Sequence, residues 1–329
     1  TMSAARPKRK RKEAEEAPPL VGLSADGGVL VGAKADAFAD CRGADVAPEQ
    51  SGPLHACTMD EFKAERSGDA ELMGQLQNTI KKCSACGKVC GFSLANCNSC
   101  GAVLPKEVTF SANIFMGFVY GVAKAPFPLS ISIRRQTPEL LVFDDLLSLC
   151  PCHLNVIPTS AHIPDWRFLL RRPAEGLALI QTLEDAAWGC VVEQFLTNEA
   201  WTTKMLRTGP ARTRKQLAAI RPHVIAGMNF PPSQFQLHIQ YFLPPFLPFQ
   251  YRMYLDGQHM THKRFFPLEY VKAVLALNDP VDVTMDTPIE DLIERFDDRV
   301  PYDEVHAACY GRVEASQQLL GNWQAGDFD

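Results

Sequence analysis

The sequence predicts an α+β fold, and three patterns along the chain support that class. Polar and apolar residues alternate from Ser233 to Gln240, as in a strand with one buried face. Apolar residues recur at helical spacing from Ala174 to Leu196 and again between Pro288 and Leu320, which predicts one long helix and a small helical extension. Two Cys-x-x-Cys pairs between residues 83 and 100 predict a metal-binding ribbon ahead of the main domain.

Length and composition fit one compact core with smaller attachments. The 329 residues can form one or two domains, and a hydrophobic content of 46% is ample for a buried core. The formal net charge of -5 argues against a protein that coats nucleic acid through bulk charge alone. No apolar run approaches the length of a membrane span, so we expect a soluble protein with no membrane partner.

The two cysteine pairs form the strongest metal-binding pattern. Each pair is followed by a glycine, and the short loop between the pairs places four thiolates on two tight turns, which suits tetrahedral zinc. A pair of disulfides is the alternative. However, the total of 11 cysteines is odd, the others are scattered and the sequence shows no signal peptide, which indicates a reducing compartment. Four thiolates leave no open coordination position, so we expect a structural Zn²⁺ site that serves folding and docking. The predicted ligands are Cys83, Cys86, Cys97 and Cys100.

The first 75 residues are predicted to form a flexible basic leader. They are rich in Ala, Gly, Pro and Asp and show little sustained periodicity. Within them, Pro7–Lys12 is a compact basic run, which is typical of a nuclear import signal or a nucleic-acid patch, although a solvated tail is also compatible. We therefore expect an intracellular protein of the nucleus or the cytoplasm.

A lone histidine stands at the centre of the alternating segment. In a strand, Gln236, His238 and Gln240 project from one face, with Ser233 and Asn229 close by in sequence. Neutral imidazole is nucleophilic, and a reference pKa of about 6.5 leaves it mostly neutral at cellular pH. Its attack on an α-phosphate would form a nucleotidyl-histidine intermediate, with the amides and the hydroxyl as neutral donors to the phosphoryl oxygens. A half-buried strand with ordinary polar residues on its outer face is the alternative.

This segment resembles the hallmark strand of the histidine-triad (HIT) superfamily, which reads His-φ-His-φ-His-φ-φ and whose middle histidine attacks the α-phosphorus of a nucleotide. His238 takes the middle position here, while Gln236 and Gln240 take the two flanking positions. The galactose-1-phosphate uridylyltransferase and diadenosine tetraphosphate phosphorylase branches read His-x-His-x-Gln, so Gln240 is similar to these transferases. Gln236 departs from all the common patterns.

Two upstream segments extend the resemblance. Leu141–Leu146 and Cys152–Pro158 look like the family's "aFxD…gHxLVIPkxH" stretch. The resemblance implies that Asp145 binds the ribose hydroxyls and that His153 belongs to the nucleotide site. Asn113–Phe115 is similar to the family's opening strand.

Over about residues 109–255, the resemblance implies an antiparallel sheet crossed by a long helix. It places Asn229 and Ser233 where the family holds phosphate oxygens. Residues 177–196 would form the surface through which family members commonly dimerise, so a homodimer is expected. The predicted organisation is leader 1–75, zinc ribbon 76–106, HIT-like catalytic domain 107–265 and helical C-terminal extension 266–329.

The resulting functional hypothesis is nucleotidyl transfer or phosphorolysis at a nucleotide phosphoanhydride or sugar-nucleotide bond. A glutamine at the third position of the motif donates a hydrogen bond but no proton, so leaving groups and acceptors that are themselves phosphates are favoured. Hydrolysis of a dinucleoside polyphosphate, a nucleotide cap or a DNA-linked adenylate is the alternative, with the leader and the ribbon holding DNA or RNA. A non-catalytic subunit that binds nucleotide or nucleic acid is a third hypothesis.

Overall fold

The structure is a computed structural model and describes residues 55–320, except 93, 98–99, 121, 125–132, 146–147, 208 and 210–212. The basic run Pro7–Lys12 and the rest of the predicted leader up to residue 54 lie outside the described residues.

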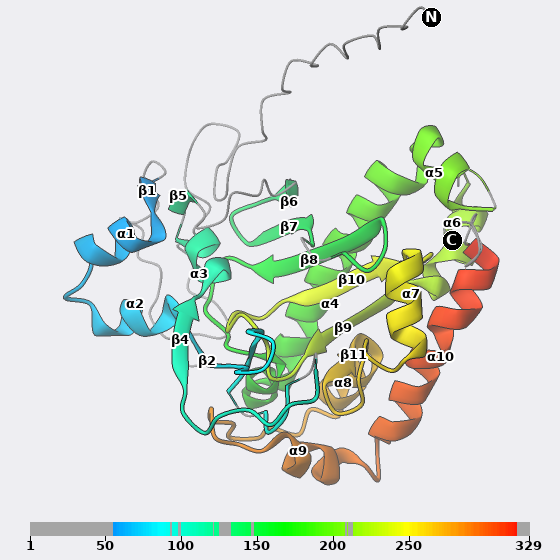
Figure 1. Cartoon of the computed structure of the whole chain (residues 1–329). Coiled ribbons are helices and arrows are strands. Elements are labelled where there is room, and N and C mark those ends of the chain that lie inside the picture. Colours follow the sequence, from blue (N-terminus) through cyan, green and yellow to red (C-terminus); the bar gives the residue numbers. More distant parts are fainter. Residues whose placement is uncertain are drawn as a thin grey trace, which may run out of the picture.

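A six-stranded sheet forms the centre of the molecule (Figure 1). All of its pairings are antiparallel, as the sequence predicts. In order across the sheet, its strands are β11 (Phe265–Pro267), β9 (Ile225–Asn229), β10 (Ile239–Leu243), β8 (Cys152–Pro158), β7 (Leu140–Asp144) and β6 (Ile133–Gln136).

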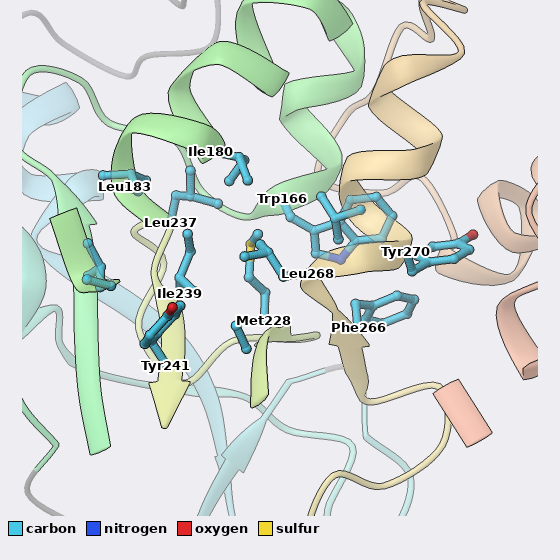
Figure 2. Packing of buried hydrophobic residues seen from close by; sticks show 14 of the residues in the cluster. Trp166, Ile180, Leu183, Met228, Leu237, Ile239, Tyr241, Phe266, Leu268 and Tyr270 are labelled. Carbon is cyan, nitrogen blue, oxygen red and sulfur yellow. The ribbon is translucent and has the colours of Figure 1, made fainter. Parts of the chain in front are cut away.

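One face of this sheet is apolar and is covered by the long helix α4 (Pro173–Cys190), which continues as a π-helical turn to Leu196. Proline at the first helical position suits the start of α4 because that position needs no backbone donor. The buried Ile180 and Leu183 meet strand residues such as Ile239, as Figure 2 shows. Each such side chain contributes about 1.5–3 kcal/mol through burial. The helix expected at 174–196 is thus present.

The C-terminal helices belong to the same core. They are α8 (Leu268–Ala276), α9 (Ile289–Phe296) and α10 (Tyr302–Leu320). The predicted helical stretch after Pro288 is therefore confirmed. However, β11 pairs with β9, and the buried residues of α8 and α9 join the cluster under α4. The predicted boundary at residue 266 does not separate two units, because the sheet needs this segment to complete its edge and its apolar layer.

The opposite face of the sheet is partly covered by N-terminal elements: β1 (His55–Thr58), α1 (Met59–Glu65), α2 (Ala70–Gln75), α3 (Ile114–Val119) and β5 (Val122–Lys124), with β1 and β5 parallel. Met59, Phe62 and Leu72 are buried against sheet residues Phe143 and Ile157. The prediction of a flexible leader up to residue 75 is therefore wrong for this stretch, because its apolar residues cover the sheet.

Asn113–Phe115 also differs from the predicted strand. The Asn113 side chain accepts a hydrogen bond from the backbone of Met116 at 3.2 Å, so this residue begins helix α3 instead.

A second sheet of three antiparallel strands holds the cysteine pairs. Its order is β3 (Val89–Gly91), β2 (Gln77–Lys82) and β4 (Thr109–Ala112). We call residues 77–112 the four-cysteine module. The remaining helices are α5 (Glu199–Met205), α6 (Arg214–Ile220) and α7 (Pro248–Leu255). Among the described residues, no helix combines the length and apolar character needed to cross a membrane.

Candidate functional site

Polar side chains gather on the face of the main sheet that lies opposite α4. Across the strands, Phe143, Asn155, Gln240 and Gly227 are neighbours in register, so their side-chain positions share this face. His153 stands two residues before Asn155 on β8, and its ring lies 5.1 Å from that of Phe242, its cross-strand partner. Polar residues from β8 and β10 thus stand between two apolar clusters, one under α1–α3 and one near Phe242.

The segment that leads to His238 is a loop and not a strand, because β10 begins only at Ile239. Gln236 explains the difference. Its amide nitrogen donates to the carbonyls of Pro158 and Ala161, each at 2.8 Å, and its amide oxygen accepts from the backbone of Ile163 at 3.1 Å. These contacts use both amide hydrogens of a fully buried side chain. Gln236 therefore fixes the loop, residues 230–238, and its amide does not face a ligand.

His238 is held in one tautomer. Its Nδ1 lies 2.8 Å from the carbonyl oxygen of Gln236, which can only accept, so Nδ1 carries the hydrogen and Nε2 carries the lone pair. The residue is 6% exposed, and the Phe115 ring meets it edge-on at 5.0 Å. Burial lowers the pKa of His238, and the Gln236 carbonyl and Asp145 oppose this effect. The imidazole is therefore neutral near pH 7.

Asp145 and its neighbours form the polar centre of this face. Asn155 donates to the Asp145 carboxylate at 2.8 Å. His153 accepts at Nδ1 from the backbone of Leu149 at 3.1 Å, so its Nε2 carries the hydrogen. That Nε2 lies 3.8 Å from the Asp145 carboxylate, which is too long for a hydrogen bond, and it is buried without a partner among the described residues. A buried donor of this kind suits a ligand oxygen.

Two adjacent aspartates are separated by the alternation of β7. Asp144 forms a two-bond ion pair with Arg134, at 2.7 and 2.6 Å, so its carboxylate is already occupied. Asp145, just past the strand, turns to the polar face. The structure thus brings Asp145, His153, Asn155, His238 and Gln240 to one face.

The two other predicted phosphate ligands lie at the end of β9 and in the loop that follows it. Asn229 ends β9, two residues after Gly227, and is half-buried on the same face. Ser233 is exposed in the loop. No hydrogen bond among the described residues joins either residue to His238.

The four-cysteine module contacts the loop through a buried amide. Asn78, on β2, is fully buried; its side-chain oxygen accepts from the backbone of Phe235 at 2.9 Å. Its nitrogen donates to Ala112 at 2.9 Å and to the Gln234 side chain at 3.3 Å. On the other side, His162 donates from Nε2 to the Phe235 carbonyl at 2.8 Å. Both backbone groups of Phe235 are thereby fixed three residues before His238.

Close packing adds to these hydrogen bonds. A Cβ at Gly91 would lie 2.6 Å from the Pro231 side chain, so only glycine allows β3 to approach the loop this closely. The rings of Phe92 and Phe235 are 6.0 Å apart. Burial lowers the pKa of His259, and Lys88 of the module and His153 of the polar face lower it further.

Within the module, the two Cys-x-x-Cys turns have the same geometry. The backbone of Gly87 donates to Cys83 and that of Gly101 to Cys97, each at 2.9 Å, and both glycines have φ of +74°. Only glycine adopts this φ without strain. The sulfur atoms of Cys83, Cys86, Cys97 and Cys100 all lie within 4.8 Å of one another and could hold a metal ion.

No family model, curated protein or solved structure matches this chain. The HIT resemblance therefore stays a prediction.

Asn155, Phe115 and Asn78 are site residues that the sequence did not single out. Asn155 does carry a signal, because it is a polar residue between Leu154 and Val156 in an otherwise apolar stretch of strand. Asn78 stands between two polar residues of β2 and carries none. Phe115 carries none, since its contact with His238 joins segments more than 100 residues apart.

Replacing Asn78 with alanine is expected to lower the free energy of unfolding by about 1–3 kcal/mol, because the buried backbone donor of Phe235 then loses its acceptor. Urea unfolding would measure the change. Asn96→Ala is the control, since Asn96 is an exposed asparagine of the same module with one hydrogen bond, to Gly101. Equal effects of the two substitutions would contradict the role given to Asn78.

The stability of the fold is expected to fall as the pH falls below about 6.5. Burial lowers the pKa of His153, His162 and His238, so the folded chain keeps them neutral where the unfolded chain binds protons. The free energy of unfolding then drops by roughly 1.4 kcal/mol per pH unit for each histidine that stays neutral.

Urea unfolding between about pH 7.5 and pH 5.5 measures this slope. His162→Gln should reduce the slope, because it removes one of the buried histidines. A free energy of unfolding that does not change over this range would show that these histidines are protonated in the folded state.

Proposed function

We propose that this protein transfers a nucleotidyl group from a nucleotide phosphoanhydride or sugar nucleotide to a phosphate acceptor, through a covalent intermediate on His238. One observation carries the proposal: the Nδ1 hydrogen bond to the Gln236 carbonyl leaves a neutral ring with its Nε2 lone pair available. A lone histidine used only for packing does not need the polar row of Asp145, Asn155 and Gln240 beside it.

The first step forms a bond from Nε2 to the α-phosphorus, and the bond from phosphorus to the leaving oxygen breaks with its electron pair on that oxygen. The ring becomes cationic. The Gln236 carbonyl and Asp145 both favour that charge, since both act to raise the pKa of His238. In the second step an acceptor oxygen bonds to phosphorus, and the electron pair of the phosphorus–nitrogen bond returns to Nε2.

Hydrogen-bond donors on the same face support a nucleotide ligand. Gln240 is half-buried next to Asn155 and offers an amide to a phosphoryl oxygen. His153 offers the buried Nε2 hydrogen, and Asp145 offers a carboxylate for ribose hydroxyls. Asn155 orients that carboxylate. Asn229, at the end of the neighbouring strand β9, would donate a further hydrogen bond to a phosphate oxygen.

The chemistry of the flanking positions favours phosphate as leaving group and acceptor. The side-chain amide of Gln236 is already hydrogen-bonded to backbone groups, and the amide of Gln240 is not an acid that could protonate a leaving group. A diphosphate or sugar-phosphate leaving group needs no proton near neutral pH, unlike an alkoxide. Phosphorolysis or transfer is therefore preferred over release of an alcohol.

Hydrolysis of a nucleotide bond within a cap, a dinucleoside polyphosphate or a DNA-linked adenylate is a second candidate. The observation in its favour is the close packing of the four-cysteine module, at Gly91, against Pro231 in the loop of His238. That position would let the module touch the nucleic-acid part of a substrate whose α-phosphorus lies at His238.

Zinc is the ion that we propose for the module. Tetrahedral zinc with bonds of about 2.3 Å to sulfur separates its ligands by about 3.8 Å. The sulfurs of Cys83 and Cys100 are 3.6 Å apart, as are those of Cys86 and Cys97, which is close to this separation, and all four sulfurs lie within 4.8 Å of one another. Four thiolates leave no site for substrate, so the ion would fold the module and take no part in the reaction.

Product analysis separates the candidate reactions. The protein would be incubated with ATP, GTP, UDP-glucose and diadenosine tetraphosphate, with and without inorganic phosphate, and the products followed by phosphorus NMR. The proposal expects phosphate-dependent release of a nucleoside diphosphate from at least one donor. A nucleoside monophosphate formed equally well without phosphate would favour the hydrolase, and no product from any donor would count against both reactions.

A further inference from the structure

A cavity of about 320 Å³ opens on the sheet face opposite His238. Its lining comes from α4, β9, β10, α8 and α10, together with the short 3-10 helix Arg221–His223. Val224, Ala226 and Leu268 give it an apolar part. A cavity of this volume is at the lower end of the range for small-molecule sites, so its occupant would be the size of a small metabolite.

Tyr241 supplies a hydrogen-bond donor to this cavity. The residue is 1% exposed, lines the cavity and makes no side-chain hydrogen bond to any described residue. Burial raises its pKa, and Glu184 raises the pKa further, so the hydroxyl stays protonated at all physiological pH values. Figure 2 shows its ring among the apolar residues under α4. A buried hydroxyl that faces a cavity without a partner suits a ligand acceptor.

Two of the cations in the lining are neutralised and fixed. Lys272 pairs with Glu184 at 2.6 Å. Arg312 pairs with Glu269 at 2.5 Å and also donates to the Val224 carbonyl at 3.2 Å. These pairs hold the walls of the cavity in place and contribute no net charge.

Arg221 is the cation that remains. Its partner Asp185 is 3.4 Å away, lies outside the lining, and has a side chain that is 74% exposed. Solvent weakens a pair of this kind. The lining therefore has three basic and two acidic residues, which leaves one positive charge, at Arg221, in the same cavity as the Tyr241 hydroxyl.

We infer that this cavity binds a small organic anion, with a carboxylate or phosphate oxygen between Arg221 and the Tyr241 hydroxyl and the apolar body against Val224 and Leu268. The net positive lining disfavours a cation, and an uncharged ligand would leave Arg221 with only the exposed Asp185 as its partner. Because the cavity and the polar face lie on opposite sides of β10, this binding does not depend on the function proposed for His238.

Isothermal titration calorimetry would measure ligand binding to the cavity. The His238→Ala variant is used because it cannot form a covalent adduct with a nucleotide at the polar face. The probes are benzoate against benzamide, and AMP against adenosine, which differ in the anionic group. Inorganic phosphate tests the group alone. We expect benzoate to bind at least about tenfold more tightly than benzamide, or AMP to bind at least about tenfold more tightly than adenosine. The pair that shows this difference tells whether the site prefers a carboxylate or a phosphate.

Substitutions place the binding in the cavity. Tyr241→Phe should weaken the bound anion about three- to tenfold, and Arg221→Gln by more. Both variants keep the apolar packing, which thermal unfolding would verify. Arg295→Gln, at another exposed ion-paired arginine, is the matched control and should have no effect. No binding of any anion at millimolar concentration, or binding unchanged by Tyr241→Phe and Arg221→Gln, would overturn the inference.

Discussion

Removal of the metal ion is expected to unfold the four-cysteine module, which is the largest effect on stability that the structure predicts. The buried apolar residues of the module are mainly the cysteines and Leu104. A core of this size cannot hold residues 77–112 alone, so we expect metal binding to supply most of their stability. Structural zinc sites contribute about 10–16 kcal/mol of binding free energy in small domains.

Unfolding of the four-cysteine module should also disturb the polar face. Asn78 and Gly91 both belong to strands of the module and both contact residues 231–235, so their loss would free the loop before His238. Hydrogen exchange should show lost protection in residues 77–112 and in this loop after chelation. Helix α8 should keep its protection, because its buried residues pack with α4 on the far side of the sheet.

Cysteine substitutions give the matched comparison. Cys97→Ser should remove the metal, measured by elemental analysis of the purified protein. Cys90→Ser should retain it: the Cys90 sulfur lies 3.7 Å from that of Cys97, yet Cys90 is outside the group of four that could hold the ion. Unchanged hydrogen exchange in metal-free protein would show that the module folds without the ion.

Replacement of His238 is expected to cause the largest loss of activity. His238→Ala removes the nucleophile and leaves only the donors on the face, so turnover should fall on the order of 10⁴-fold or more. Gln240→Leu keeps the nucleophile and removes one donor, for which a loss of roughly 10²-fold is expected. Steady-state rates with the donor that wild type uses would give both values.

His262→Asn is the control for removal of a histidine. His262 is exposed on the surface and pairs with Asp303 at 2.7 Å, away from the polar face. Its rate should equal that of wild type. If His238→Ala kept more than a tenth of the wild-type rate, another residue would have to act as nucleophile.

Local patterns in the sequence predicted the parts of the structure that depend on near neighbours. The cysteine turns were predicted from the spacing of the cysteines and the glycine after each pair, and both glycines have a positive φ in the structure. Helix α4 was predicted from helical periodicity. The alternation from residue 233 was misleading, because Asn78, His162 and the backbone at 158–163 hold that stretch as a loop. These contacts join residues 70–160 positions apart, which no local pattern encodes.

The same limit applies to the candidate site. Asp144 is bound to Arg134 on the other face and Asp145 is bound to Asn155 on the polar face, while the role of Asp145 at a ribose stays a prediction. Gln236 was predicted to bind a phosphate group of the ligand, yet its side-chain amide donates a hydrogen bond to the backbone carbonyl of Ala161. The cavity at Tyr241 gathers residues from six separate elements, so only the folded chain shows it.

The most direct test of the proposed function is to trap the nucleotidyl group on the protein. Purified protein would be mixed with α-labelled ATP, GTP, UDP-glucose or diadenosine tetraphosphate, quenched in alkali, and digested for peptide mapping. We predict label that resists base, is released by acid, maps to the peptide containing His238 and is absent from His238→Ala. Measurable nucleotide binding without label from any donor, or label that persists in His238→Ala, would contradict the covalent mechanism.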